Sequence, residues 1–165
     1  MNTMPLDIRY KIENIDTYFR KDELSVLLFY IKGINNDLAT KLYFLLEKEI
    51  AFRLENHLNI GDLDAFNNML AHFDAGDIEE SIQLITNQVI PSLKNETLNI
   101  WEKYGGFDNL KDEVNNGNDW SFNLSINQEY VPEDIDYYID MIIEIKELLQ
   151  KSLNLNTPIL VIYED

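Results

Sequence analysis

Apolar residues recur at helical spacing over much of this chain, and the first strong pattern begins near residue 22. Asp22 is a candidate N-cap, and the segment ELSVLLFYIK after it is apolar around most of its circumference before Gly33. This pattern predicts a buried helix. A second helix, predicted from about 37 to 58, has a broad apolar face that suits the centre of a bundle. Its apolar residues are Leu38, Leu42, Leu45 and Phe52, flanked by Tyr43, Leu46, Ile50 and Leu54.

Two shorter helices are predicted in the middle of the chain. One follows Asp62 and ends before Gly76, because glycine commonly follows a helix C-terminus. Another starts near Asp77, where Glu80 completes a pattern like a capping box. The apolar positions of the two segments are Phe66, Met69, Leu70 and Phe73, then Ile78, Ile82, Ile85 and Val89.

Proline and glycine are expected to divide the next part of the chain. Pro91 should break or kink the helix before it, because proline removes a backbone donor and its ring clashes with the preceding turn. A further turn or two runs to a stop at Gly105 and Gly106, and NNGND at 115–119 is a strong loop signal. The apolar residues of this region are Leu93, Ile100, Trp101 and Tyr104.

Three segments have features of strands. LDIRYKI at 6–12 alternates apolar and polar residues, which is compatible with an edge strand or with the start of a helix. WSFNLSI at 120–126 alternates in the same way, and PILVIYED at 158–165 is an apolar run of strand length. The last two flank a predicted helix, and the unit has the size of a crossover with a small parallel pair of strands.

These patterns predict a predominantly α-helical α+β fold, a helical bundle with a small C-terminal strand-helix-strand element. Residues 1–165 are expected to form a single compact domain, because no repeat or linker interrupts them. The expected core includes Leu28, Leu45, Phe52, Ile82, Ile139 and Ile142.

A row of acidic side chains follows one face of the helix predicted over 132–153. Pro132 suits the first helical position, and the acids near it lie at the positive end of the helix dipole. Acids four residues apart repel one another by ~0.2–0.5 kcal/mol a pair, so the row gives the isolated helix no advantage. The row, called the acidic row below, consists of Glu133, Asp136, Asp140, Glu144 and Glu147. The opposite, apolar side consists of Ile135, Ile139, Ile142, Leu149 and Leu153.

Aromatic side chains border the acidic row. Tyr137 and Tyr138 lie between the acidic and apolar sides of the predicted helix, and Trp120 and Tyr130 precede that helix. Tyrosines at the margin of a charged surface are typical anchors of protein interfaces and are also typical of core margins. Both interpretations remain open, and we take Tyr137 as a candidate partner-binding residue.

The net charge of −17 lies entirely in the later part of the chain. Residues 1–53 contain eight bases and eight acids, whereas residues 54–165 contain five bases and twenty-two acids. This asymmetry predicts an acidic face with a basic partner, although many acidic proteins are simply well solvated. It opposes direct binding of nucleic acid, because phosphate contacts need Lys and Arg.

Several classes of site and location have little support. The chain has no cysteine, and its two histidines, His57 and His72, show no metal-ligand spacing, so we expect no metal and no cofactor. No nucleophile motif or phosphate-binding loop is present. The N-terminus lacks the features of a secretory signal, and no apolar run approaches the ~20 residues of a membrane span. We therefore expect a cytoplasmic protein without a membrane partner.

One short motif suggests an alternative activity. AFRLENHL puts Arg53 and His57 one turn apart on one helix face. In outline this resembles the Arg-and-His helix motif of HEPN-type ribonucleases, whose motif has at least one more residue between the two. The resemblance implies an all-helical RNA-cleaving enzyme with Arg53 and His57 as catalytic residues. Arg53 and His57 are otherwise explained by pairing with Glu49 or Glu55 and by the helix dipole, respectively.

The acidic row leads to the principal functional hypothesis, a non-enzymatic protein that binds a basic protein. Its predicted binding residues are Glu133, Asp136, Tyr137, Asp140, Glu144 and Glu147. Small acidic immunity proteins that neutralise nuclease toxins have this general make-up, because an acidic surface can compete for a basic active site. The alternatives are the helical ribonuclease and a structural or regulatory subunit whose charge keeps it dissolved.

Overall fold

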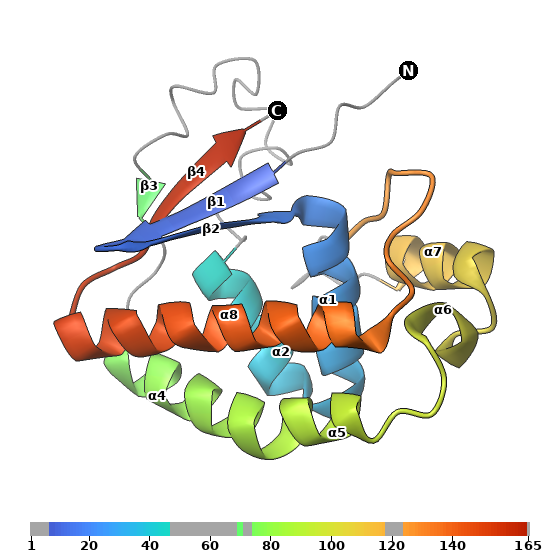
Figure 1. Cartoon of the computed structure of the whole chain (residues 1–165), viewed down its shortest axis with the longest axis horizontal. Helices are drawn as coiled ribbons and strands as arrows, with labels where there is room; N and C mark the ends of the chain where they lie inside the picture. The colour runs from blue at the N-terminus through green and yellow to red at the C-terminus, as the bar shows by residue number, and fades with distance from the viewer. Residues whose placement is uncertain (1–6, 47–68, 71–73, 118–123, 165) are drawn as a thin grey trace.

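A small antiparallel sheet lies above a layer of helices (Figure 1). The computed structural model describes residues 7–46, 69–70, 74–117 and 124–164. The predicted class, a mostly helical α+β fold, is confirmed. The strands are β1 (Asp7–Ile12), β2 (Ile15–Arg20), β3 (Met69–Leu70) and β4 (Leu160–Glu164). The helices are α1 (Lys21–Ile34), α2 (Asn36–Leu46), α4 (Ala75–Leu84), the π-helical turn η2 (Ile85–Val89), α5 (Ile90–Lys94), α6 (Ile100–Lys103), α7 (Phe107–Asn116) and α8 (Ile135–Leu155).

The sheet is built around β1. Its order is β2-β1-β4-β3, and every pairing is antiparallel. Residues 7–12 therefore form a strand and not the start of a helix, but the predicted edge position is wrong, because β1 lies between β2 and β4. β1 and β2 are joined by a two-residue turn at Glu13, where φ is +51°, so that Ile12 pairs with Ile15. The apolar residues that alternate in β1 face the core, because every second side chain, from Ile8 to Ile12, is buried.

The predicted strand at 120–126 is not found where the structure describes it. Leu124 and Ile126 are buried, but 124–126 pair with no strand, and 120–123 lie outside the described residues. Side chains bind this segment's backbone instead: Asn115 Oδ1 accepts the Ile126 N–H at 2.8 Å. Its alternation therefore reflects a half-buried extended segment whose backbone has non-strand partners. The parallel pair is replaced by the antiparallel contact of β4 with β1.

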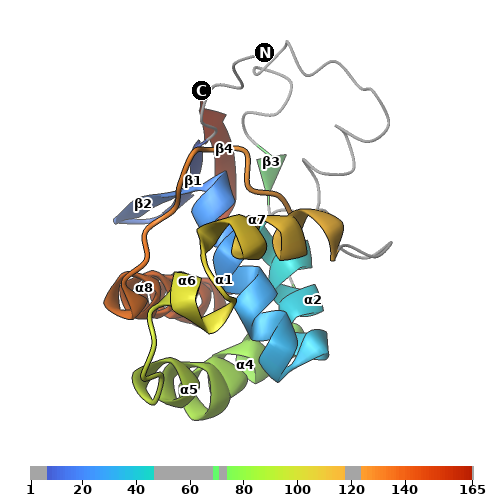
Figure 2. The same cartoon turned by 90° about the vertical axis from the view of Figure 1, so that its right-hand side faces the viewer.

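The helix predicted from Asp22 is α1, and it begins at Lys21. Asp22 is not its N-cap: its buried carboxylate accepts the N–H groups of Asn127 and Gln128, both at 2.8 Å. In Figure 2, α1 runs between α8 and α2. Only the part of the predicted 37–58 helix up to Leu46 is described, as α2.

Two further predictions fall partly outside the described residues. The rest of the 37–58 helix, including Phe52, lies there. The short helix predicted after Asp62 is described only at Met69 and Leu70, which form β3 and pair with β4. At these two positions the helix prediction is wrong, because pairing with β4 overrides the local helical spacing.

The helix that carries Pro91 continues through the proline. It begins three residues earlier than predicted, since Asp74 is the N-cap and accepts the Asp77 N–H at 3.0 Å. Just before Pro91 the helix widens to η2, in which the Ile90 N–H donates to Ile85 O, five residues back. The wider turn accommodates a residue without an N–H, and α5 follows directly.

Turn residues behave largely as predicted around α6 and α7. Gly105 and Gly106 follow α6 with φ of +85° and +109°, values that favour glycine. The predicted loop at 115–119 starts slightly too early, because α7 extends to Asn116 and Gly117 is its C-cap. Residues 118 and 119 lie outside the described part.

The core lies between the sheet and the helices. Leu28, Leu45 and Ile142 are buried as predicted, whereas Ile82 and Ile139 are half-buried at its margin. The buried face of α8 is rotated from the predicted one, since Ile135 and Leu153 are only half-buried. α8 contacts β1 and β2 on one side and α4 and α5 on the other, so a wider arc is covered. That arc contains Tyr138, Met141, Ile142, Ile145, Leu148, Leu149 and Ser152.

Candidate partner-binding surface

Four residues of the acidic row, from Asp136 to Glu147, lie on the solvent side of α8. The five carboxylate residues are all exposed, as the amphipathic pattern predicts. Glu133 precedes the helix, and its carboxylate lies 3.5 Å from Asn99 Nδ2. Pro132 is also outside the helix, because Asp134 is the N-cap and accepts the Asp136 N–H at 3.0 Å. The dipole argument therefore applies to Asp134 and Asp136.

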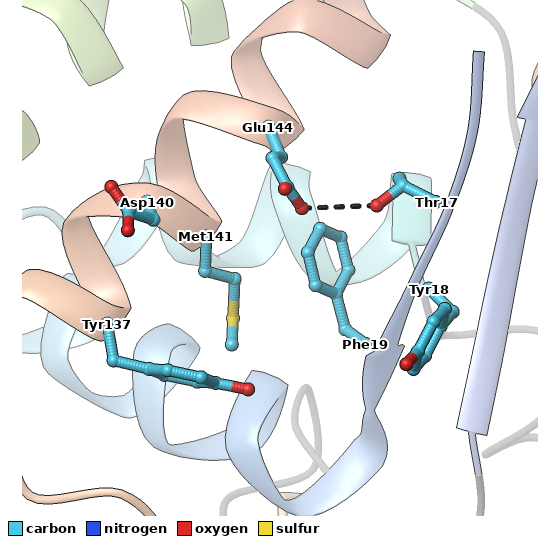
Figure 3. Close-up of a pocket in the computed structure, with 7 residues that line it drawn as sticks. All are labelled: Thr17, Tyr18, Phe19, Tyr137, Asp140, Met141 and Glu144. Atoms are coloured by element: carbon cyan, nitrogen blue, oxygen red, sulfur yellow. Dashed lines mark hydrogen bonds between the residues drawn. The ribbon is translucent and has the colours of Figure 1, made fainter.

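A groove of about 380 Å³ separates the first half of α8 from β2. Figure 3 shows side chains from both elements around it, with Asp140 and Glu144 on α8 and Phe19 on β2. Thr17 Oγ1 donates to Glu144 Oε2 at 3.1 Å across the groove. The lining residues are Thr17, Tyr18, Phe19, Tyr137, Asp140, Met141 and Glu144.

Among the described residues, no Lys or Arg pairs with Asp140 or Glu144. Both carboxylates are exposed on the α8 wall of the groove, while Phe19 and Met141 are buried beneath them. The surface therefore combines unpaired negative charge with an apolar base. This combination fits a long basic side chain, whose stem is apolar and whose end is charged.

Tyr137 is fixed in place at one end of the groove. Its hydroxyl donates to the carboxylate of Glu23, and its ring meets that of Tyr138 edge-on at 5.5 Å between centroids. Burial raises the pKa of the Tyr137 hydroxyl, and the Glu23 carboxylate raises it further. The side chain is nevertheless 42% exposed. Tyr137 thus presents a ring to solvent in one defined position.

Glu23 is the buried partner of that tyrosine. It is 4% exposed, and burial raises the pKa of its carboxyl, while the Tyr137 hydrogen bond and Arg20 act in the opposite direction. Arg20 Nε lies 3.9 Å from its carboxylate. Glu23 therefore holds the Tyr137 hydroxyl by a hydrogen bond and does not itself line the groove.

The structure brings three of the six predicted binding residues together. Tyr137, Asp140 and Glu144 line the groove, whereas Glu133, Asp136 and Glu147 lie on the exposed surface away from it. The groove residues of β2 were missed by the sequence analysis. A signal was present in the sequence, because Ile15, Thr17, Tyr18 and Phe19 are β-branched or aromatic residue types that favour strands.

The ribonuclease alternative stays a prediction, because its residues Arg53 and His57 lie outside the described residues. In the described part of the chain, no cluster of three or more His, Asp or Glu could hold a metal ion. None of the described helices combines the length and apolar character needed to cross a membrane.

Comparisons of the chain with protein families, with characterised proteins and with solved structures found no match.

Proposed function

We propose that this protein binds a basic protein through the acidic row and the adjoining groove. The observation that carries the proposal is the groove between β2 and α8, where Asp140 and Glu144 stand unpaired above Phe19 and Met141. The fixed ring of Tyr137 supplies an aromatic anchor beside them. A partner can thus meet apolar contact, an aromatic face and negative charge within one surface.

The exposed carboxylates contribute mainly to association. Charges in water attract a basic partner over about a Debye length and speed encounter, and they add little to the stability of their own helix. The ring of Tyr137 acts at shorter range and slows dissociation, because it is held before binding and loses little conformational freedom.

A nuclease toxin is the partner class that we favour, with this protein as its immunity protein. The active site of a nuclease is basic because it holds phosphates, so an acidic surface competes for it directly. This role predicts that the gene lies beside a gene for a secreted toxin and that co-expression protects cells from that toxin.

The decisive experiment compares two triple variants with the same change in charge. Asp136→Asn, Asp140→Asn and Glu144→Gln neutralise the acidic row, whereas Asp108→Asn, Asp112→Asn and Glu113→Gln neutralise exposed positions of α7. The basic protein that co-purifies with the tagged chain is purified, and its association and dissociation rates are measured at low and high salt.

The α8 triple variant should associate more slowly and lose most of its salt dependence, while the α7 triple variant should bind like the parent. Tyr137→Ala should instead speed dissociation. Equal association by both triple variants and the parent at both salt concentrations would show that the acidic row is only a solvated face.

A further inference from the structure

The strand β2 has an open edge next to the groove. It pairs with β1 on one side, and within the described part of the chain no strand pairs with its other side. Figure 1 and Figure 2 agree that β2 and α8 lie on the same face of the molecule. A partner that approaches the groove therefore also meets the strand edge.

The register of the hairpin determines which backbone groups this edge offers. Ile12 and Ile15 flank the two-residue turn and form its hydrogen-bonded pair, and hydrogen-bonded and non-hydrogen-bonded pairs then alternate along the ladder. Asp16 and Tyr18 fall on non-hydrogen-bonded positions opposite Lys11 and Arg9. Their N–H and C=O groups consequently point away from β1, toward the open edge.

The side chains of β2 alternate relative to the groove in the same way. Thr17 and Phe19 face α8, as Figure 3 shows. Tyr18 is 58% exposed and lies under Arg9, whose guanidinium carbon is 5.8 Å from the ring centre. A strand added beside β2 would lie about 4.8 Å from it and would also direct every second side chain toward α8. Those side chains would meet Asp140 and Glu144.

We propose that the partner is recognised by strand addition: an extended segment with Lys or Arg at every second position pairs with the open edge of β2. Its basic side chains lie over Phe19 and Met141 and reach Asp140 and Glu144. This inference rests on the proposed function and specifies how the basic partner is held. Backbone hydrogen bonds supply affinity, and the carboxylates select basic residues at alternate positions.

Charge also decides against a second copy of this chain as the added strand. Pairing two β2 edges would bring two acidic rows of a protein with net charge −17 close together. Like charges at an edge oppose self-pairing, as they do at many natural sheet edges. A basic extended segment removes this repulsion.

Two isomeric peptides test the inference with the full chain. One is the fluorescently labelled peptide Thr-Lys-Thr-Lys-Thr-Lys-Thr-Lys-Thr, and the other contains the same residues with the lysines in one block. Fluorescence anisotropy at low salt should give at least about tenfold tighter binding for the alternating peptide, because only that peptide places every lysine on the α8 side. N-methylation should abolish its binding when applied to one alternate set of residues and should be tolerated on the other.

A pair of variants of this chain gives a second test. Tyr18→Pro removes the outward N–H of the edge, at a position type where edge strands tolerate proline, and Tyr18→Ala removes only the ring. With folding checked by circular dichroism, Tyr18→Pro should weaken the alternating peptide at least about tenfold more than Tyr18→Ala.

The outcomes separate this inference from the proposed function. Equal binding by the two isomers, equal effects of the two N-methylated sets, or no binding by either peptide overturns strand addition. If both isomers bind equally and both weaken in Asp140→Asn/Glu144→Gln, the acidic surface still binds basic partners and only strand addition is wrong. If the peptides bind the double variant as tightly as the parent, both strand addition and the proposed function are wrong.

Discussion

The hydroxyl of Tyr137 on α8 donates a hydrogen bond to the buried carboxylate of Glu23 on α1. The two residues are far apart in the sequence, and their contact joins the helix with most of the acidic row to α1, the most buried of the described helices. It also fixes the ring that borders the groove. One hydrogen bond therefore links the exposed Tyr137 ring to the buried Glu23 carboxylate.

Removing the Tyr137 hydroxyl should destabilise the fold. Tyr137→Phe leaves the buried Glu23 carboxylate without this donor, so the free energy of unfolding should fall by about 1–3 kcal/mol. Tyr130→Phe is the matched control, because Tyr130 is 67% exposed and should change stability by less than about 0.5 kcal/mol. Urea unfolding of both variants measures the difference, and equal stabilities would contradict the importance of the contact.

Glu23 should make stability depend on pH in a specific direction. Burial raises the pKa of its carboxyl in the folded state, so the folded protein keeps this proton to higher pH than the unfolded chain. The stabilisation is complete below the ordinary pKa of 4.5 and is lost as pH rises through the folded pKa. The free energy of unfolding of the parent minus that of Glu23→Gln should therefore decrease as pH rises above 4.5. A difference that rises with pH would refute this assignment, and Glu79→Gln, on the surface of α4, is the control for loss of charge.

Asp22 should be important for the segment before α8. Asp22→Ala leaves the N–H groups of Asn127 and Gln128 without their acceptor, which should cost about 1–3 kcal/mol for each group that stays buried. Asp22→Asn retains an acceptor oxygen and should be intermediate. Thermal unfolding ranks the three proteins, and amide exchange at 127 and 128 should accelerate in the alanine variant. If Asp22→Ala is as stable as the parent, the segment is held by other contacts.

Neutralising the acidic row should leave the fold intact. The variant with Asp136→Asn, Asp140→Asn and Glu144→Gln removes like-charge pairs of ~0.2–0.5 kcal/mol each, but it also removes the favourable interaction of Asp136 with the helix dipole, worth about 0.3–1 kcal/mol, so its stability should be nearly unchanged. Glutamine can still accept the Thr17 hydrogen bond at position 144. Chemical unfolding at low salt measures this effect. A large loss of stability would mean that these carboxylates serve the fold.

Truncating a core residue should cost more stability than truncating a residue at the margin of the core. Ile142→Ala removes a completely buried side chain and should cost about 2–5 kcal/mol. Ile82→Ala acts on the same residue type at a half-buried position, so its cost should be smaller. Urea unfolding compares the two directly, and equal costs would indicate that the margin at Ile82 is as tightly packed as the interior.

The helical content and the amphipathic character of α8 were predictable from the sequence. Helical spacing of apolar residues is a local property, so α1, the first part of α2 and α8 were predictable, as were the exposed carboxylates from Asp136 to Glu147. The alternation at 7–12 narrowed that segment to two possibilities. The apolar run at the C-terminus was correctly predicted as a strand, because its composition favours one regardless of its partner.

Which segments meet in the fold was not predictable from local patterns. The alternation at 120–126 could not reveal that Asp22 and Asn115 would bind the backbone at 126–128, because those contacts join residues distant in the sequence. Strand pairing is non-local for the same reason, so the placement of β4 beside β1 was not predictable. The groove needs both α8 and β2, and its position depends on how the helix packs against the sheet. The sequence therefore determined the charge of the candidate surface, and tertiary packing decided its shape.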